Sequence, residues 1–384
     1  MTPVRVLIVS GIWPPDIGGP ASHGPGLGRY LADRGHRVTA VASVSTAPAD
    51  PGFTLIPTSR DRVLAMRWAD AELKIAAMAR AADIIYATGL YHRSAVAGLI
   101  ARVPVVLKLV NDPAYERARN SGLFAGTLEE FQSSSASRGI ALLKRLRGAM
   151  LARARGIIVP SSYLAEIVRG WGVPDAKITV IPNPAPAEPE RTPREELRRA
   201  LGLEGPSIVF AGRFVLQKNL PMVIEAVRKL EGVTLWLVGD GPERSRVVEE
   251  IAARDLGDRV RICPSVPRRE ALRWMRAADV TVLPSSWENY PHAAVESLTV
   301  GTPVVATSVG GVPEIVEHGT SGLLVAPNDA EGLAAALRQA LYEPRVGELL
   351  RLGAEAVGDR FHPTRMFSAA ERVIVSEAKT RKPT

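Results

Sequence analysis

The hydrophobic pattern of the chain alternates short apolar runs with longer segments of helical periodicity. Several of the runs in the first half are apolar on both faces, which is typical of strands in a buried parallel sheet. Strands are predicted at residues 4–10, 38–43, 83–88, 103–110 and 156–160. Helices are predicted between them, at residues 26–34, 63–81, 92–102 and 140–153. This repeated order of strand and helix predicts a parallel sheet covered by helices on both faces.

The regular pattern stops at a proline-rich segment, residues 185–193, which is predicted to be a linker. Repeated prolines are incompatible with a helix interior or a central strand, because each lacks a backbone donor. The strand and helix pattern then resumes. Strands are predicted at residues 207–211, 234–238, 260–263, 280–284 and 304–307.

The two halves predict an α/β protein with two doubly wound, Rossmann-like domains. The predicted domains are residues 1–184 and 194–360, and residues 361–384 are predicted as a C-terminal helix that can cross back to the first domain. Ligands of doubly wound sheets bind beyond the carboxyl ends of the strands. The crevice between the two domains is therefore the expected site.

Composition narrows the function classes. The net charge of +8 favours anionic partners, but aromatic residues make up only 5% and show no base-stacking pattern, so nucleic-acid binding is not expected. Cys263 is the only cysteine, which excludes an internal disulfide, and no Cys/His cluster indicates zinc. No run of about 18 apolar residues indicates a membrane span, and a cytoplasmic location is expected.

The segment from Phe210 to Asn219 carries two cations, Arg213 and Lys218, directly after a predicted strand and before a predicted helix. Guanidinium and ammonium groups beside a helix start can neutralise the oxygens of a diphosphate. The alternative is that both are ordinary solvated charges on a loop.

Two acids follow a later strand, Glu288 in a loop and Glu296 in the next predicted helix. If that helix begins near Pro291, Glu296 lies more than one turn inside it, while Glu288 stays near its positive end. Carboxylates accept hydrogen bonds from paired sugar hydroxyls. The alternative is two unrelated surface acids.

These segments, in this order, closely resemble family 4 (GT4) of the retaining glycosyltransferases. The resemblance covers most of residues 205–340, including the glycine turn at 239–241, the strand entry at 301–305 and the segments 310–316 and 319–325. A weaker likeness at residues 14–20 matches the glycine loop of the family after its first strand.

The resemblance implies a GT-B architecture with the donor held by the carboxyl-terminal domain and the acceptor on the amino-terminal side. It also implies a role for each matching residue: Arg213 and Lys218 contact the diphosphate, Glu296 binds the ribose, and Glu288 addresses the transferred sugar with the amides of Asn289, Tyr290 and Pro291. Gly18, Gly19 and Gly239 are implied in donor binding, because a glycine lets backbone approach phosphates.

The acceptor side matches the family less well. Many relatives place a histidine after the strand predicted at residues 103–110, where this chain has Asp112. Asp112 is the nearest titratable group and could orient the acceptor hydroxyl, or it could cap the turn before Pro113. His92 is the other candidate, although a histidine near a helix start is more often structural.

We therefore expect a retaining transfer of sugar from a nucleoside-diphosphate sugar to an acceptor hydroxyl. No Asp-x-Asp pair is present, so no metal and no other cofactor are expected. A nucleotide-sugar epimerase and a non-catalytic nucleotide-sugar or membrane-surface protein remain as alternatives. The acceptor, lipid-linked or glycan, is not identified. Residues 140–155 form a basic amphipathic segment that could contact the inner face of an anionic membrane, or pack as an ordinary solvated helix.

Overall fold

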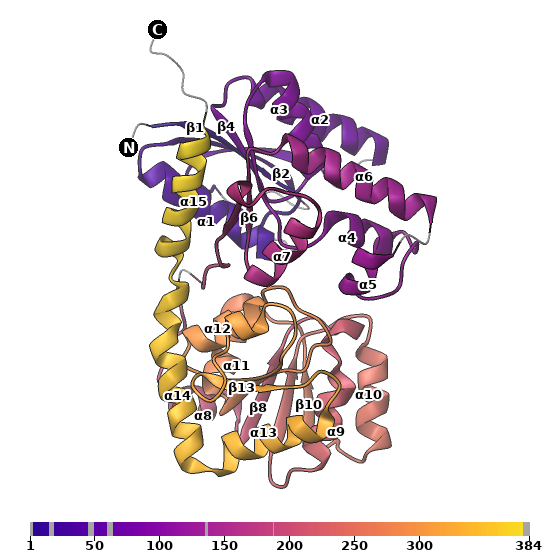
Figure 1. The fold of residues 1–384 in the computed structure, drawn as a ribbon. Coiled ribbons are helices and arrows are strands. Elements are labelled where there is room, and N and C mark those ends of the chain that lie inside the picture. Colours follow the sequence, from indigo (N-terminus) through magenta and orange to yellow (C-terminus); the bar gives the residue numbers. More distant parts are fainter. Residues whose placement is uncertain are drawn as a thin grey trace. The chain divides into compact units, whose positions relative to one another are not determined.

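The computed structural model describes residues 3–14, 19–44, 50–59, 64–134, 137–186 and 188–378. These residues form two compact units (Figure 1). Unit 1 contains the described residues up to Asn183 and from Pro363 onward, and unit 2 runs from Pro184 to His362.

Unit 1 is built on a parallel sheet whose described strands lie in the order β3-β2-β1-β4-β5-β6-β7. The strands are β1 (Arg5–Ser10), β2 (Arg37–Val44), β3 (Thr54–Ser59), β4 (Ile84–Ala87), β5 (Val105–Lys108), β6 (Gly156–Val159) and β7 (Ile178–Val180). Apolar side chains alternate between the two faces, so the sheet separates two hydrophobic cores. This is the covered parallel sheet that the pattern predicts.

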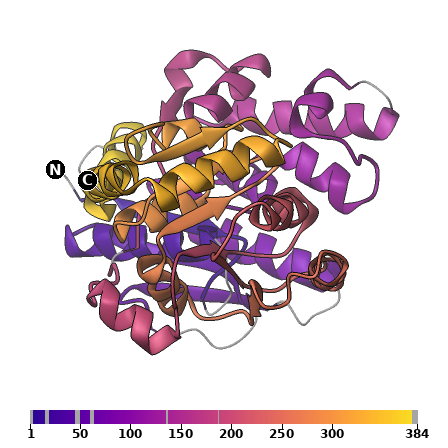
Figure 2. The same cartoon turned by 90° about the horizontal axis from the view of Figure 1, so that it is seen from below.

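Helices cover both faces of the unit 1 sheet (Figure 2). One face packs against α1 (Gly19–Asp33) and α15 (Pro363–Glu377), and the other against α2 (Leu64–Ala79), α3 (Tyr91–Ala101), α6 (Arg138–Arg153) and α7 (Ser162–Gly170). Two short helices, α4 (Pro113–Asn120) and α5 (Leu128–Ser133), lie between β5 and α6 along the chain. Thr127 and Glu130 form a reciprocal cap that starts α5.

The C-terminal helix α15 belongs to unit 1 although the chain reaches it from unit 2. Its Glu371 carboxylate is buried and accepts hydrogen bonds from Arg34 and from Nε2 of His36 at 3.0 Å. Nδ1 of His36 in turn accepts a hydrogen bond from the backbone N–H of Val4. These contacts and the apolar face of α15 attach the helix to the sheet.

Unit 2 has a second parallel sheet, with described strands in the order β10-β9-β8-β11-β12-β13. The strands are β8 (Ser207–Ala211), β9 (Thr234–Val238), β10 (Val260–Cys263), β11 (Val280–Leu283), β12 (Val304–Thr307) and β13 (Gly322–Val325). The helices are α8 (Arg194–Leu201), α9 (Leu220–Arg228), α10 (Arg244–Ala253), α11 (Arg268–Ala277), α12 (His292–Thr299), α13 (Ala330–Tyr342) and α14 (Pro344–Gly358). The predicted fold class, two doubly wound parallel-sheet domains, is confirmed.

Three strands were not expected from the sequence: β3, β7 and β13. All three are edge strands, which have one neighbour and bury less apolar surface than central strands. Pro57 interrupts the pattern of β3, and a proline is tolerated there because an edge strand has donors facing away from the sheet. The predicted linker is not a free connection, since Ala185 is buried in unit 2 and its N–H donates to the carbonyl of Phe361.

Candidate functional site

Apart from Gly18 and Gly19, the predicted donor residues lie in unit 2, in the loops and the helix that follow neighbouring strands. The order β9-β8-β11-β12 brings the carboxyl ends of these four strands to one edge of the sheet. The loop after β8 carries Arg213 and Lys218, and the loop after β11 carries Glu288. Residues that are about seventy positions apart in sequence, such as Lys218 and Glu288, therefore meet in space.

Hydrogen bonds join the β8 loop to the β11 loop. The N–H of Ser286 donates to the carbonyl of Gln217 at 2.8 Å, and the side-chain amide of Gln217 donates to the carbonyl of Trp287 at 2.7 Å. Because these two hydrogen bonds join the loops, the side chains that follow on each loop are placed in register. Lys218 and Glu288 are the next residues on the two loops.

Lys218 and Glu288 form a largely buried ion pair. The side chain of Glu288 is 8% exposed and that of Lys218 is 18% exposed. The same Glu288 oxygen also accepts a hydrogen bond from the hydroxyl of Ser285 at 2.7 Å. Glu288 is therefore an anchored carboxylate and not the solvated surface acid that the sequence also allowed.

Glu296 lies in the second turn of α12, as the spacing predicts. The carboxylate is buried and accepts a hydrogen bond from Nε of Arg268, the first residue of α11, at 2.6 Å. Burial raises the pKa of Glu296, and the charge of Arg268 opposes that shift. A partly desolvated carboxylate of this kind is a strong acceptor for hydroxyl groups.

The other predicted donor residues are placed at the same edge. Arg213 is exposed, and no described side chain forms an ion pair with it. Asn289 and Tyr290 are buried, and Pro291 caps the start of α12, so a ligand here would meet backbone groups at the helix start more than these side chains.

The packing of two loops requires glycine at position 239, independently of any ligand. A Cβ atom at this position would lie 2.0 Å from the carbonyl oxygen of Gly212, so any side chain would push apart the loops after β8 and β9. The neighbouring Gly241 makes a similar close approach to the backbone of Phe214. These glycines shape the loop that carries Arg213.

Two family models match the chain, one for each unit. Residues 17–188 match the model described as Glycosyltransferase Family 4, and residues 193–356 match Glycosyl transferases group 1. The chain carries a Glycosyltransferase Family 4 domain followed by a Glycosyl transferases group 1 domain. These matches confirm the resemblance inferred from the motif order. The segment that matches the group 1 model contains Arg213, Lys218, Glu288 and Glu296.

Curated relatives agree with this family. A D-inositol 3-phosphate glycosyltransferase of Xylanimonas cellulosilytica is 34% identical over 57% of this chain and 55% of its own length. A 2-deoxystreptamine glucosyltransferase of Streptomyces kanamyceticus is 34% identical over 55% of this chain and 58% of its own. The chain thus spans about half the length of the curated relatives that it matches.

Solved structures show the same fold over nearly the whole chain. Anabaena HepE in complex with UDP is similar with a TM-score of 0.77 at 20% identity, over 97% of this chain and all of that one. The lipopolysaccharide glycosyltransferase WaaG is similar with a TM-score of 0.72 at 18% identity, over 96% of this chain and 99% of its own. This chain has the GT-B fold, as predicted.

Asp112, the predicted acceptor-side group, follows β5 as the sequence predicts, but its side chain is engaged by the protein. Its carboxylate is completely buried. One oxygen caps α4 by accepting from the N–H of Ala114 at 2.8 Å, and the other accepts from Gln132 and forms an ion pair with Arg147. The guanidinium carbon of Arg147 also lies 3.9 Å from the centroid of the Trp171 ring. These contacts are those of the alternative role, a helix cap, and the acceptor-side role stays a prediction.

The remaining amino-terminal candidates are His92 and the two glycines, Gly18 and Gly19. His92 is exposed at the second position of α3, just beyond the carboxyl end of β4. Desolvation and the charge of Arg117 lower its pKa, which keeps the imidazole neutral at pH 7. Its acceptor-side role stays a prediction. Gly19 is the first residue of α1, and Gly18 lies outside the described residues.

The sequence reasoning missed Lys108 and Arg268. Lys108 is buried at the end of β5, where its ammonium donates to the carbonyl of Ile181 at 2.8 Å and burial lowers its pKa to about 7. A lysine inside the apolar run at residues 103–110 was the available signal. Arg268 could have been found only through its contact with Glu296, since nothing local distinguishes it from Arg269.

The described residues contain no cluster of three or more His, Cys, Asp or Glu side chains arranged to hold a metal ion. Their helices include none with both the length and the apolar character needed to cross a bilayer.

Proposed function

We propose that this chain transfers a sugar from a nucleoside-diphosphate sugar to an acceptor hydroxyl with retention of the anomeric configuration. The observation that carries the proposal is the edge of unit 2, where Lys218 and Arg213 lie on one loop and two buried carboxylates, Glu288 and Glu296, lie on the next loop and helix. Cations suit the diphosphate, and carboxylates suit the hydroxyls of ribose and sugar.

The proposed chemistry needs charge stabilisation on the leaving group. As the glycosyl–phosphate bond breaks, negative charge grows on the diphosphate, and Arg213 with Lys218 would stabilise it. The departing phosphate oxygen, on the same face as the incoming hydroxyl, would accept the proton of that hydroxyl. Retention would follow because the new bond forms on the face that the leaving group vacates.

The test is a screen of UDP, GDP, ADP and TDP sugars by thermal shift, followed by product analysis. A ligand that binds only the folded state raises the unfolding temperature, and the shift grows with the logarithm of its concentration above the Kd. UDP-glucose is the first donor to try, because HepE has been solved with it, and cyclitols are the first acceptors, because the relatives are named for inositol phosphate and deoxystreptamine. A product of inverted configuration would contradict retention.

An epimerase of the same architecture is the second candidate. Incubation of the bound donor without acceptor separates the two, since an epimerase converts it to an isomeric nucleotide sugar, whereas a transferase gives only slow hydrolysis. A non-catalytic sensor would shift the unfolding temperature and convert nothing.

Metal independence is part of the proposal. Arg213 and Lys218 supply two positive charges where other enzymes use a divalent ion. We expect full turnover in excess chelator, measured as product formed against an untreated control. Loss of turnover that manganese restores would refute this point.

Contact with the inner face of an anionic membrane is also proposed, through a smaller part of segment 140–155 than the sequence indicated. Ile140, Met150 and Leu151 are buried in unit 1, and Arg147 pairs with Asp112. The exposed face of α6 retains Leu142, Leu146 and a set of arginines, and the proposed contact involves these residues with their neighbours on α3.

A further inference from the structure

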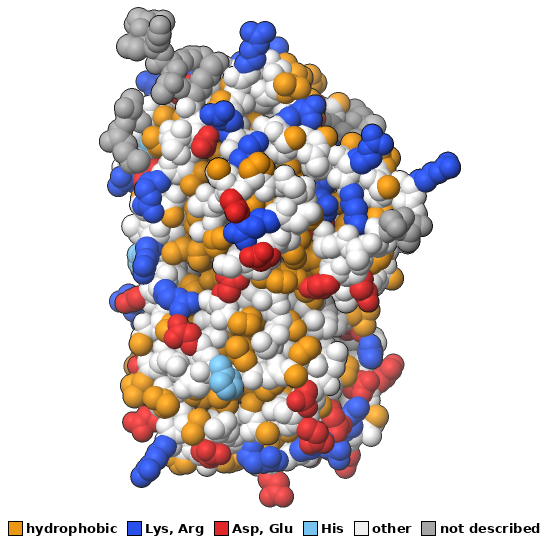
Figure 3. Space-filling model, in the orientation of Figure 1, with side chains coloured by type: hydrophobic (Ala, Val, Ile, Leu, Met, Phe, Trp, Pro, Cys, Tyr) orange, Lys and Arg blue, Asp and Glu red, His pale blue; other side chains and the backbone are white. Residues whose placement is uncertain are grey.

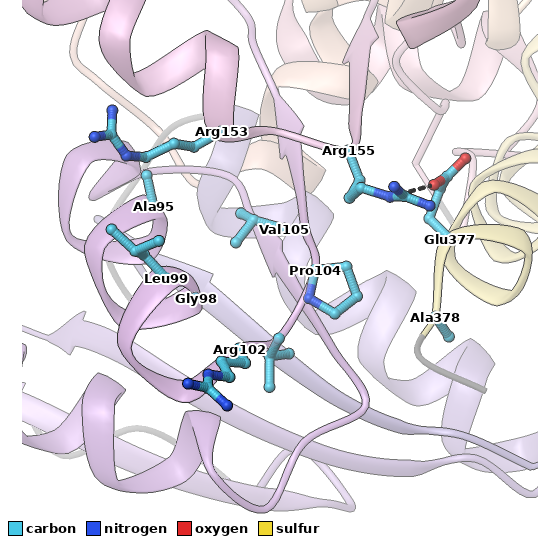
Figure 4. Close-up of a pocket in the computed structure, with 11 residues that line it drawn as sticks. Ala95, Gly98, Leu99, Arg102, Pro104, Val105, Arg153, Arg155, Glu377 and Ala378 are labelled. Atoms are coloured by element: carbon cyan, nitrogen blue, oxygen red, sulfur yellow. Dashed lines mark ion pairs between the residues drawn. The ribbon is translucent and has the colours of Figure 1, made fainter. Parts of the chain in front are cut away.

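A hollow of about 570 Å³ lies in unit 1 at the amino edge of the sheet, away from the loops that follow the strands. It is formed by the ends of α3, α6 and α15 and the start of β5 (Figure 4). Three arginines line it, Arg102, Arg153 and Arg155, with Leu99 and Pro104 between them. We call it the arginine hollow.

The arginine hollow has an excess of positive charge. Arg155 pairs with Glu377, the only carboxylate among its lining residues, at 3.3 Å. Arg153 donates to a carbonyl of its own helix, and no described side chain pairs with the guanidinium of Arg102. Arg102 also holds a left-handed backbone, with φ of 54°, at the end of α3, where glycine is favoured. Two guanidinium groups therefore remain available to an anion.

The surface next to the hollow is apolar. Leu99 and Ile100 at the end of α3 are 60% and 61% exposed, and Leu142 and Leu146 of α6 are also exposed. Neither α3 nor α6 contains an aspartate or a glutamate. Basic and hydrophobic side chains alternate over these helices in Figure 3, without acidic ones among them.

We propose that the arginine hollow binds the phosphate of an anionic lipid while the exposed side chains of α3 and α6 enter the bilayer interface. The occupant follows from the two features together. Free phosphate would account for the arginines but not for four exposed leucine and isoleucine side chains, and an apolar partner would not account for the absence of acids. A bilayer with anionic headgroups supplies both an apolar phase and phosphate at its surface.

This inference does not rest on the transfer reaction, because the hollow lies at the edge of unit 1 opposite to the loops that follow β4 and β5. Membrane binding is therefore expected without donor or acceptor. Vesicle binding can fail while the proposed sugar transfer stands, and sugar transfer can fail while vesicle binding stands.

The test is co-sedimentation of the full chain with vesicles. We expect binding to vesicles of equal parts phosphatidylglycerol and phosphatidylcholine, weakened by salt, and none to phosphatidylcholine alone. The double variant Arg102→Gln/Arg153→Gln should lower the partition coefficient at least about tenfold. The double variant Leu99→Ser/Ile100→Ser should lower the partition coefficient at low and at high salt alike, since it removes apolar side chains that enter the bilayer interface.

The matched control is Arg345→Gln/Arg199→Gln, which removes the same charge from exposed positions of unit 2. It should bind like wild type, and all variants should keep the wild-type unfolding temperature. Equal binding by the hollow variant and the control, or no pelleting of wild type, overturns the proposal. So does stabilisation of wild type by glycerol 3-phosphate without vesicle binding, which would assign the hollow to a soluble phosphate ester.

Discussion

Replacing Asp112 by alanine should lower the free energy of unfolding by about 3 to 5 kcal/mol, the cost typical of breaking a buried ion pair. The variant leaves the buried Arg147 without its counter-charge and removes the cap of α4. Burial already lowers the pKa of Arg147 despite the neighbouring carboxylate, which shows how poorly this position solvates a charge. Urea unfolding followed by circular dichroism measures the loss.

A matched carboxylate makes this result specific. Asp175 is exposed and pairs with Arg169 in the same unit, so Asp175→Ala should leave the unfolding curve nearly unchanged. Asp112→Asn keeps the cap but not the charge, and it should also destabilise. If Asp112→Asn instead unfolds like wild type while transfer falls at least about tenfold at saturating donor, roughly 1.4 kcal/mol of barrier, the acceptor-side role is correct.

Replacing Arg213 or Lys218 by alanine should weaken donor binding by about one to two decades. Each loses charge-assisted hydrogen bonds to the proposed diphosphate, worth roughly 1.5 to 3 kcal/mol. Isothermal titration with the nucleoside diphosphate identified in the donor screen measures this. Lys229→Ala is the control, since Lys229 follows α9 and pairs with Glu331 at the surface.

The structure predicts a difference between the two variants. Arg213 is exposed and has no ion-pair partner among the described side chains, so Arg213→Ala should keep the wild-type stability. Lys218 neutralises the buried Glu288, so Lys218→Ala should lose stability as well as affinity. If both variants bind donor like wild type, the phosphate assignment is wrong.

The periodicity of the sequence predicts the central elements of the fold well. The predicted strands at residues 207–211, 234–238, 260–263 and 304–307 coincide with β8, β9, β10 and β12. Of these, β8, β9 and β12 are buried on both faces and their apolar runs are unambiguous, whereas β10 is a partly exposed edge strand. The edge strand β3 and the short α4 and α5 carry weaker patterns, since the first contains a proline and the others are too short for helical periodicity to be read.

The motif order also indicates the family and predicts the donor-side residues, because both signals are local in the chain. Spacing alone places Glu296 inside α12 and Glu288 before it. The sequence could not decide which cation meets which acid. That Lys218 reaches Glu288, and Arg268 reaches Glu296, depends on the order of strands in the sheet, a long-range property.

Burial is what only the tertiary structure decided. Asp112 and Arg147 are both candidate functional charges in the sequence, one for an acceptor and one for a membrane, yet Arg147 of α6 pairs with Asp112 at the start of α4. On α6, the packing against unit 1 selects which leucines and arginines remain exposed. A residue type reports the chemistry that a side chain can perform, whereas its neighbours determine whether that chemistry is open to a ligand or consumed in the fold.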